Sequence, residues 1–405
     1  MNVLTVGPSP YLHTKNSRIH ASVLNTLSKS QQQKINISSA VWHHDEGFFL
    51  PNEEGEHEYC PDDSEDCESV LYPFTLESEQ KEAVLYELMK KLQPDVVISI
   101  GDYKDTSFIY SIKSLLPHLF KWISIASVDS SPISNVYSHA LEYADCIISL
   151  NNFSYNNIKN ICNNRIERVL YGPKKTFTCD KAEKDNDIIK YISCSKNAQP
   201  SNLGAYIKSV SELGKTYGGD VFQSYLHTNL YDPGDYDLEV LIERYNAQNI
   251  LNMPQEYVSV KDGVSDEEMA IKYADKHAYV DCSVKSGVAL SMLEAMRFGC
   301  IPIGINAYAL SEIIHKMPDE FRFFIPSVLY VGQNEEEYFV ADPIGMQKTM
   351  EDFLFLCTNK EKLAEAQKSA IEISLQYSAE SFQNKFNKIF WEVYEQKTPI
   401  PIESF

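Results

Sequence analysis

Residues 264–312 contain the side chains that are best suited to bind a ligand or take part in a reaction, because a polar turn there separates two apolar runs. Residues 278–282 (AYVDC) predict a short strand, Ser286 and Gly287 a turn, and the residues from Leu290 onwards a helix that packs against a sheet. The first amides of such a helix are unpaired, and the helix dipole favours negative charge beside them. The pattern therefore predicts either a phosphate site or a plain tight turn at the backbone of Gly287, Val288, Ala289 and Leu290.

The segments around this turn are typical of an α/β domain. Ser265 is followed three residues later by Glu268, a pairing in which each side chain caps a free N–H at the start of a helix. Residues 300–305 (CIPIGI) are nearly all apolar, which indicates a buried parallel strand. The turn is therefore expected at the end of one strand of a parallel sheet, where open α/β sheets bind their ligands.

Strands and helices alternate along the rest of the chain. Further strands are predicted at residues 2–7, 36–42, 95–101, 121–128, 146–150, 166–171, 188–193, 221–226 and 327–331. Further helices are predicted at residues 18–28, 79–92, 108–116, 135–143, 153–161, 203–213, 238–245, 343–357 and 360–396. This alternation predicts an α/β protein whose parallel sheets have helices on both faces.

The length of 405 residues suits two domains. We expect a first domain over residues 1–172, a polar link over 173–187, a second domain over 188–378, and a last helix with a tail over 379–405. Residues 45–82 form an insert in which Asp and Glu are concentrated. This composition favours a solvated loop over a binding tail.

The central stretch resembles the nucleotide-binding core of the retaining glycosyltransferases of family 4, which have the GT-B fold of two facing Rossmann-like domains. The pattern of that family runs from VSDEEL, through a strand ending in Ser and an E-G-F-G-L segment, to L-E-A-M and G-x-P. In this chain VSDEEM starts at Val264, Ser283 ends the strand, and Leu293 opens L-E-A-M without a gap. The resemblance implies an acceptor-side first domain, a second domain that binds a nucleotide sugar, and a last helix that crosses back onto the first domain.

The resemblance also implies roles for four residues. A glutamate in the position of Glu294 usually holds the ribose hydroxyls of the donor nucleotide, although an exposed helix glutamate would have the same sequence. The other glutamate of the family falls on Ser286, whose hydroxyl bonds a sugar more weakly than a carboxylate does. Lys196 takes the place of an Arg that faces the diphosphate, and Ser201 the place of a Lys five residues on. Lys196 can neutralise a phosphate as a point charge.

Loops after other predicted strands give further candidates, because such loops meet at one edge of each sheet. Asp129 ends a first-domain strand where the family often has His or His-Asp near the sugar; a helix N-cap or a turn residue is the alternative interpretation. Asp129, Ser286 and Lys196 are thus the catalytic candidates. The remaining candidates are Ser9, His13, Lys15 and Asp102 on the acceptor side, and Asp262 and Gly263 on the donor side.

Two short motifs could be taken for metal sites, but loops are the better interpretation of both. The D-x-D sequence at residues 235–237 is the metal–nucleotide motif of a different transferase fold, but here it follows a Pro-Gly pair in a polar segment. The spacing of His57, Cys60 and Cys67 fits no tight zinc knuckle. We therefore expect no metal site.

Composition excludes some classes of protein and favours others. A formal net charge of −21 disfavours a protein held on DNA mainly by phosphate contacts. No apolar run reaches the ~18 residues of a membrane helix. The first residues, MNVLTVGPSP, enter a strand without a basic leader, and the nine cysteines show no repeating framework. We expect a cytoplasmic protein, and a peripheral position at a membrane is left open.

The resemblance implies a glycosyltransferase that moves a sugar from a nucleotide-diphosphate sugar, expected to be UDP-linked, to an acceptor. The acceptor is a glycan, a glycolipid, a protein or a modified nucleic-acid base, and no cofactor beyond the donor is expected. Retention of configuration and independence of metal are implied by the resemblance alone. The departures at Ser286 and Ser201 leave open a transferase-like scaffold subunit that supports an active partner. A nucleotide-sugar epimerase or hydrolase on the same fold is the third hypothesis.

Overall fold

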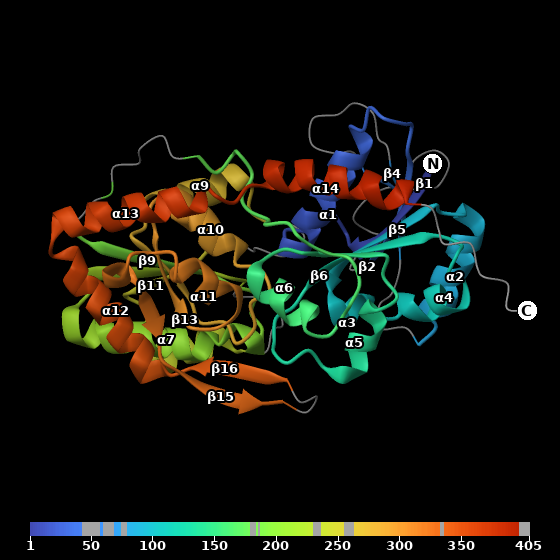
Figure 1. Ribbon diagram of the computed structural model, residues 1–405. Coiled ribbons are helices and arrows are strands. Elements are labelled where there is room, and N and C mark those ends of the chain that lie inside the picture. The colour runs from blue at the N-terminus through green and yellow to red at the C-terminus, as the bar shows by residue number, and fades with distance from the viewer. Residues whose placement is uncertain are drawn as a thin grey trace, which may run out of the picture. The chain divides into compact units, whose positions relative to one another are not determined.

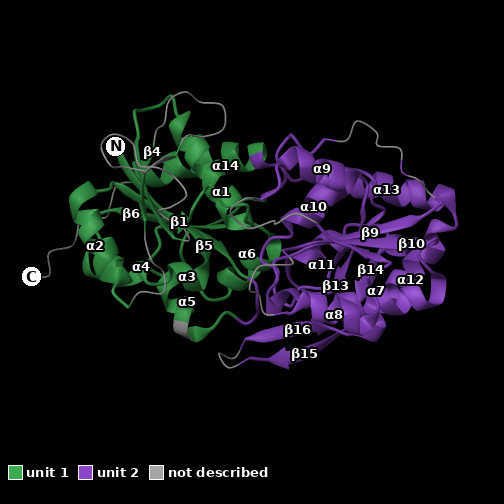
Figure 2. Cartoon of the chain, turned by 180° about the vertical axis from the view of Figure 1, so that it is seen from behind, with its two compact units in different colours: residues 1–128, 133–170, 380–405 green, residues 129–132, 171–379 purple. Residues whose placement is uncertain are grey.

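The computed structural model describes residues 1–42, 57–59, 69–73, 79–178, 184, 187–229, 236–254, 263–332 and 336–396. The chain divides into two compact units (Figure 2). Unit 1 comprises residues 1–128, 133–170 and 380–405, and unit 2 comprises residues 129–132 and 171–379. Across the described ranges, no helix combines the length and the apolar character that a membrane crossing needs.

The described residues of unit 1 form an eight-stranded sheet with helices on both faces (Figure 1). In spatial order its strands are β3 (His57–Tyr59), β4 (Ser69–Pro73), β2 (Asn36–Trp42), β1 (Asn2–Pro8), β5 (Val96–Asp102), β6 (Lys121–Ser127), β7 (Cys146–Ser149) and β8 (Ile166–Arg168). Every neighbouring pair is parallel except β3 with β4. Almost every residue of β1, β5 and β6 is buried, because helices cover both faces of a parallel sheet.

Side chains fix the starts of several helices in unit 1. Its helices are α1 (Lys15–Ser28), α2 (Lys81–Leu92), α3 (Tyr103–Thr106), α4 (Ile109–Leu115), α5 (Asn135–Leu141), α6 (Asn152–Lys159) and α14 (Ala379–Glu395). Thr14, Asp102 and Asn151 each accept a hydrogen bond from a first-turn N–H of the helix that follows. The helix predicted at residues 108–116 is preceded by a separate short helix, because the Asp102 cap starts α3 directly after β5.

The acidic insert is not a loop throughout, contrary to the prediction. β3 and β4 lie inside residues 45–82, and β4 pairs with β2 from Ile37 to Val41. Leu71 of β4 is 2% exposed and Tyr59 of β3 is 6% exposed, so both contribute to the core. The few apolar residues of these short strands are outnumbered by acidic neighbours, which conceals them in the sequence. The rest of the insert, except residues 79–82, lies outside the described residues.

The last helix belongs to unit 1, as the fold prediction requires. Gln383 Nε2 of α14 donates a hydrogen bond to the Ser22 carbonyl of α1 at 3.4 Å. Glu392 of α14 forms an ion pair with Arg165, which precedes β8. The side chains of Phe382, Phe386 and Phe390 are fully buried. α14 therefore closes the core of unit 1 with an aromatic face.

The described residues of unit 2 form a six-stranded parallel sheet and a separate hairpin. The strands of the sheet are, in spatial order, β11 (Leu251–Asn252), β10 (Phe222–His227), β9 (Ile189–Cys194), β12 (Ala278–Asp281), β13 (Ile301–Ile305) and β14 (Phe323–Ile325). The hairpin pairs β15 (Ser327–Val331) with β16 (Glu337–Ala341). Because β9 lies between β10 and β12, the loops that follow these three strands share one edge of the sheet.

Helices flank the unit 2 sheet, and two of them have the predicted bounds. They are α7 (Leu203–Tyr217), α8 (Leu238–Tyr245), α9 (Asp266–Ala274), α10 (Leu290–Arg297), α11 (Tyr308–Ile314), α12 (Pro343–Cys357) and α13 (Lys360–Ser374), with short 3-10 helices η1 (Gln199–Ser201) and η2 (Asp319–Phe321). The predicted bounds of α8 and α12 are confirmed. The capping box is also confirmed, since Ser265 and Glu268 each accept a hydrogen bond from the other's backbone N–H.

Candidate functional site

The turn between β12 and α10 lies at the carboxyl edge of the unit 2 sheet. α10 begins at Leu290, and no side chain of the described part of the chain caps its first turn. The Ser286 carbonyl accepts a hydrogen bond from the Ala309 N–H at 3.4 Å, which ties the turn to the start of α11. All residues from Ser286 to Leu290 are buried. An uncapped helix start leaves amides that can bind an anion once the anion reaches them.

Glu294 lies one turn further along α10 and is only 4% exposed. The Tyr273 hydroxyl of α9 donates a hydrogen bond to Glu294 Oε2 at 3.3 Å and lies 3.6 Å from the Cys194 sulfur at the end of β9. Burial raises the pKa of Tyr273 well above its usual value, so the hydroxyl keeps its proton. Glu294 is therefore not the exposed helix glutamate that the sequence left open, but a buried carboxylate held in one orientation.

Lys196 follows β9 at the same edge, one strand away from the turn, because β9 pairs with β12. Its side chain is exposed and forms no ion pair with another described residue. Ser201 ends the 3-10 helix η1, where its carbonyl accepts a hydrogen bond from the Cys282 thiol at 3.4 Å. The structure thus brings Lys196 and Ser201 to the edge that carries the turn, and Lys196 is the residue of the two that offers a charge.

A set of contacts from α11 and the hairpin holds the turn in place. Lys285 Nζ lies 4.3 Å from the centre of the Tyr338 ring in β16. The Tyr338 hydroxyl donates a hydrogen bond to Glu336, which is 1% exposed. The Tyr308 hydroxyl accepts a hydrogen bond from the Phe339 N–H at 2.9 Å. Tyr308 also has a φ of 57°, a conformation that costs energy in a residue other than glycine and persists only where the surroundings enforce it.

Asp129 follows β6, but its segment, residues 129–132, groups with unit 2. The Ser131 carbonyl accepts a hydrogen bond from the Glu337 N–H at 3.0 Å, so this segment adds to the edge of β16. Burial, and in smaller part the charge of Asp129, raises the pKa of Tyr308 to about 12. Asp129 therefore lies near the phenol that supports the turn. It is not a helix N-cap, because Ser134 occupies that position before α5.

The acceptor-side candidates occupy two kinds of position in unit 1. Ser9 is 1% exposed, and Asp102 caps α3 by accepting the Lys104 N–H at 2.9 Å. Ser9 follows β1 and Asp102 ends β5, and these strands are adjacent and parallel, so the structure brings both residues to one edge. His13 is exposed in the loop after β1, and Lys15 is the first residue of α1.

The remaining candidates give no metal site in the described ranges. Asp262 lies outside the described residues, as do Cys60 and Cys67, and Gly263 is half-buried just before α9. Asp237 of the D-x-D motif caps α8 by accepting the Val240 N–H at 3.0 Å, and Asp235 lies outside the described residues. Among the residues that the structure describes, no three His, Cys, Asp or Glu side chains are grouped as a metal ion requires.

Sequence reasoning missed two residues of β10 at the same edge. His227 ends β10 and pairs in register with Cys194 of β9. His227 Nδ1 and the Tyr225 hydroxyl are buried, and neither has a hydrogen-bond partner in the described structure. The strand sequence FQSYLH contains no signal that separates these residues from ordinary strand residues. Only the tertiary structure reveals that they are buried and unpaired.

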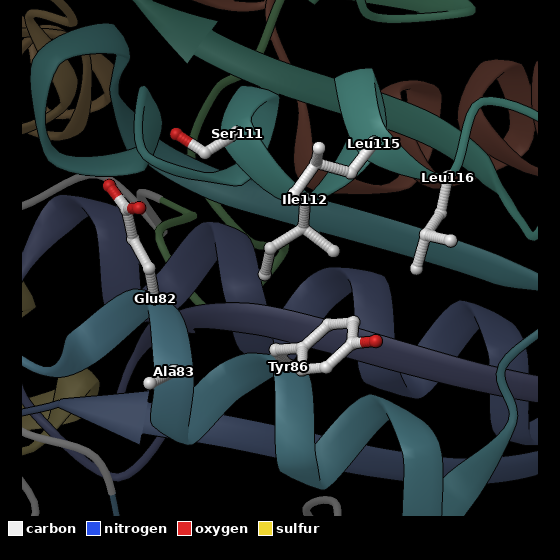
Figure 3. Close-up of a pocket in the computed structure, with 7 residues that line it drawn as sticks. All are labelled: Glu82, Ala83, Tyr86, Ser111, Ile112, Leu115 and Leu116. Carbon is white, nitrogen blue, oxygen red and sulfur yellow. The ribbon is translucent and has the colours of Figure 1, made fainter.

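A groove in unit 1 lies apart from these residues. It has a volume of about 240 Å³ and runs between α2 and α4 (Figure 3). It is lined by Glu82, Ala83, Tyr86, Ser111, Ile112, Leu115 and Leu116. Most of its surface is apolar, and none of its residues follows a strand of the sheet. We therefore assign this groove no part in the candidate site.

Comparison with known proteins identifies the fold. No family model matches the chain, and no curated protein matches its sequence. Solved structures do match over nearly its whole length. Sucrose-phosphate synthase from Thermosynechococcus elongatus aligns with a TM-score of 0.73 and 11% sequence identity, and the alignment covers 97% of this chain and 99% of that one.

Two further solved structures were determined with UDP compounds. The pneumococcal O-GlcNAc transferase GtfA, in complex with UDP and GlcNAc, aligns with a TM-score of 0.65 and 10% identity over 98% of this chain and 99% of its own. An E. coli structure described as trehalose-6-phosphate bound with UDP-2-fluoro glucose aligns with a TM-score of 0.66 and 8% identity over 98% and 100%. Identities this low establish the fold alone. The chain therefore has the GT-B fold, with two Rossmann-like α/β units and a last helix that returns to the first.

Proposed function

We propose that the protein is a glycosyltransferase that takes a sugar from a nucleotide-diphosphate sugar and transfers it to an acceptor. The observation that carries this proposal is the buried Glu294 carboxylate, held by Tyr273 one turn beyond the uncapped start of α10. The structures of similar fold that were solved with UDP and GlcNAc, and with UDP-2-fluoro glucose, favour a UDP-linked donor.

In this proposal the donor lies along the edge formed by β9 and β12. The amides from Gly287 to Leu290 bind the diphosphate, and Lys196 neutralises part of its charge. Glu294 accepts hydrogen bonds from both ribose hydroxyls, which one planar carboxylate can do because the hydroxyls lie on neighbouring carbons.

The transfer step breaks the bond between C1 of the sugar and the diphosphate oxygen and joins C1 to an acceptor oxygen. The proton of the acceptor passes to the diphosphate. Fixed amides and a nearby cation stabilise the charge that develops on the leaving diphosphate, which is usually the largest catalytic effect. Ser286 offers the transferred sugar a hydroxyl, and Asp129 offers a carboxylate near Tyr308. Retention of configuration and independence of metal remain implications of the VSDEEM and LEAM resemblance.

Acceptor binding falls to the loops of unit 1 in this proposal. These loops carry the candidates Ser9, His13, Lys15 and Asp102. Ser9 and Asp102 are fixed by their surroundings, whereas His13 is exposed. The exposed His13 is therefore the side chain most available to an incoming acceptor among the four.

A panel of UDP-, GDP- and ADP-linked sugars tests the proposal. The purified chain is incubated with each donor, with and without mixed glycan, lipid and peptide acceptors, and nucleotide release is followed. A transferase releases nucleotide faster when its acceptor is present, and the acceptor gains the mass of one sugar. Release of a free or altered sugar would favour the hydrolase or epimerase. Absence of both binding and release would contradict the proposal and favour the scaffold subunit.

A further inference from the structure

Buried polar atoms without hydrogen-bond partners gather near the ends of β9 and β10. Within the described residues they are Ser193 Oγ, Asn197 Oδ1, Asn202 Nδ2, Tyr225 Oη, His227 Nδ1 and Thr228 Oγ1. Buried polar groups are nearly always paired, because leaving one unpaired costs free energy. A cluster of exceptions at the carboxyl edge of a parallel sheet indicates a place where a polar ligand completes the missing bonds.

Tyr225 and His227 form the part of this cluster that faces α9. Alternate residues of a strand point to the same side, so these two share one face of β10. Lys272 Nζ of α9 lies 5.4 Å from the centre of the Tyr225 ring. Ser224 points to the opposite face, where its Oγ hydrogen-bonds the Tyr206 hydroxyl of α7 at 2.6 Å. The unpaired pair and the paired tyrosine therefore lie on opposite sides of the same strand.

A row of contacts joins this pair to the Glu294 carboxylate. His227 is the register partner of Cys194 on the neighbouring strand, and paired strands lie ~4.8 Å apart. The Cys194 sulfur lies 3.6 Å from the Tyr273 hydroxyl, which donates to Glu294 Oε2 at 3.3 Å. The His227 ring is thus separated from the carboxylate by two side chains only. The His227 ring and the Glu294 carboxylate lie on the side of the sheet that α9 covers.

We propose that His227 and Tyr225 bind the nucleobase of the donor. This inference rests on the proposed function, which places the diphosphate at the start of α10 and the ribose at Glu294. The base leaves the ribose on the side away from the phosphates, so it extends from Glu294 towards β9 and β10. In that direction lie two groups without a hydrogen-bond partner in the described structure, His227 Nδ1 and the Tyr225 hydroxyl.

The chemistry of the pair matches the hydrogen-bonding edge of uracil. Burial, with a smaller contribution from Lys272, lowers the pKa of His227 to about 4, so the ring is neutral near pH 7. A neutral imidazole has one nitrogen that accepts, and a phenol hydroxyl can donate. Uracil presents an N–H between two carbonyl oxygens. Nδ1 accepts the uracil N–H, and the Tyr225 hydroxyl donates to a flanking carbonyl.

Variants that retain an aromatic side chain at each position test this pair. Tyr225→Phe removes the hydroxyl and His227→Phe the Nδ1 that have no hydrogen-bond partner in the described structure. We expect each to weaken UDP binding roughly tenfold and to leave Tm unchanged or higher. Tyr206→Phe is the matched control, because it removes a hydroxyl that is bonded to Ser224. This control should lower Tm and leave the affinity for UDP unchanged.

Calorimetric titration with UDP, ADP and GDP separates the outcomes. If Tyr225 and His227 recognise the uracil base, Tyr225→Phe and His227→Phe lose more affinity for UDP than for ADP and GDP. An equal loss for all three nucleotides, or no loss, would overturn this inference and leave the proposed function standing. A wild-type protein that binds no nucleoside diphosphate would instead overturn the proposed function, and the inference with it.

Discussion

The Tyr273 hydroxyl donates a hydrogen bond to Glu294 Oε2 over 3.3 Å, and both side chains are buried. Tyr273 comes from α9, whose start is fixed by the capping box of Ser265 and Glu268, and Glu294 comes from α10. The bond therefore makes the orientation of a carboxylate depend on the packing of two helices. In the proposed function that orientation determines how well Glu294 receives the ribose.

Replacing Tyr273 by Phe keeps the buried ring and removes the hydroxyl that contacts both Glu294 and the Cys194 sulfur. We expect UDP to bind roughly tenfold more weakly, because Glu294 loses the donor that orients it. Tyr279→Phe is the control, since the Tyr279 hydroxyl donates to the Cys194 carbonyl at 3.2 Å instead. Titration calorimetry compares the two variants. Equal affinities for Tyr273→Phe and the wild type would show that the bond does not prepare Glu294 for binding.

Lys196 is exposed and forms no ion pair with a described residue, so its charge is available to the diphosphate. We expect Lys196→Ala to raise the Kd for UDP about three- to tenfold, and this difference should shrink at high salt, because salt screens exposed charges. Lys208→Ala, at an exposed position of α7, should leave the Kd unchanged. If both variants bind UDP equally well, Lys196 has no part in the site.

His20 makes the stability of unit 1 depend on pH. Its Nδ1 donates to the Pro8 carbonyl at 2.8 Å, and its Nε2 lies 2.7 Å from the Thr5 hydroxyl. Burial lowers the pKa of His20 from 6.5 to about 4. In the unfolded chain His20 therefore takes up a proton as the pH falls below 6.5, whereas in the folded chain it does so only near pH 4. Stability is retained above pH 6.5 and falls as the pH drops towards 4.

The expected loss from His20 is about 2 kcal/mol between pH 7 and pH 5. Urea denaturation at both values measures it, with His20→Gln as the comparison. The variant should be less stable than the wild type at pH 7 and should lose less stability on acidification. His227 has a similarly lowered pKa and remains in both proteins, so the difference between them isolates His20. Parallel losses in the two proteins would contradict the assignment.

Gly172 has no room for a larger residue at the start of the link. A Cβ there would stand 2.5 Å from the Tyr377 carbonyl carbon and 2.7 Å from the Ser378 nitrogen, and backbone atoms cannot move aside as a side chain can. We expect Gly172→Ala to cost about 1–3 kcal/mol of stability. Gly219→Ala is the control, because its Cβ would meet only the Asn249 carbonyl at 3.5 Å. Thermal unfolding measures both variants, and Tm should be lowered in Gly172→Ala only.

Strong local patterns in the sequence predicted the parts of the fold that depend on neighbouring residues. The capping box at Ser265 and the bounds of α8 and α12 follow from side chains a few positions apart. β3, β4, β11, β14 and β16 were missed, because two to five residues carry little periodicity. Their pairing depends on partners far away in the chain.

Some residues of the candidate site could likewise be predicted from local sequence, and others only from contacts between distant segments. Glu294 and the turn at Ser286 were placed by motif and spacing, but the Tyr273 bond that fixes Glu294 joins residues of two helices. His227 and Tyr225 have no motif at all, since their distinguishing property is a missing partner in the folded protein. A sequence shows which groups a chain contains, whereas unpaired buried groups appear only once the packing is known.

Binding of UDP to the wild type and to Glu294→Gln tests the central claim most directly. Glutamine keeps the shape of Glu294 and the contact with Tyr273, but it loses the charge and one acceptor position for the ribose hydroxyls. The account predicts that the wild type binds UDP and that Glu294→Gln binds it at least tenfold more weakly with an unchanged Tm. Equal UDP affinity in the two folded proteins would contradict the claim that Glu294 holds the donor.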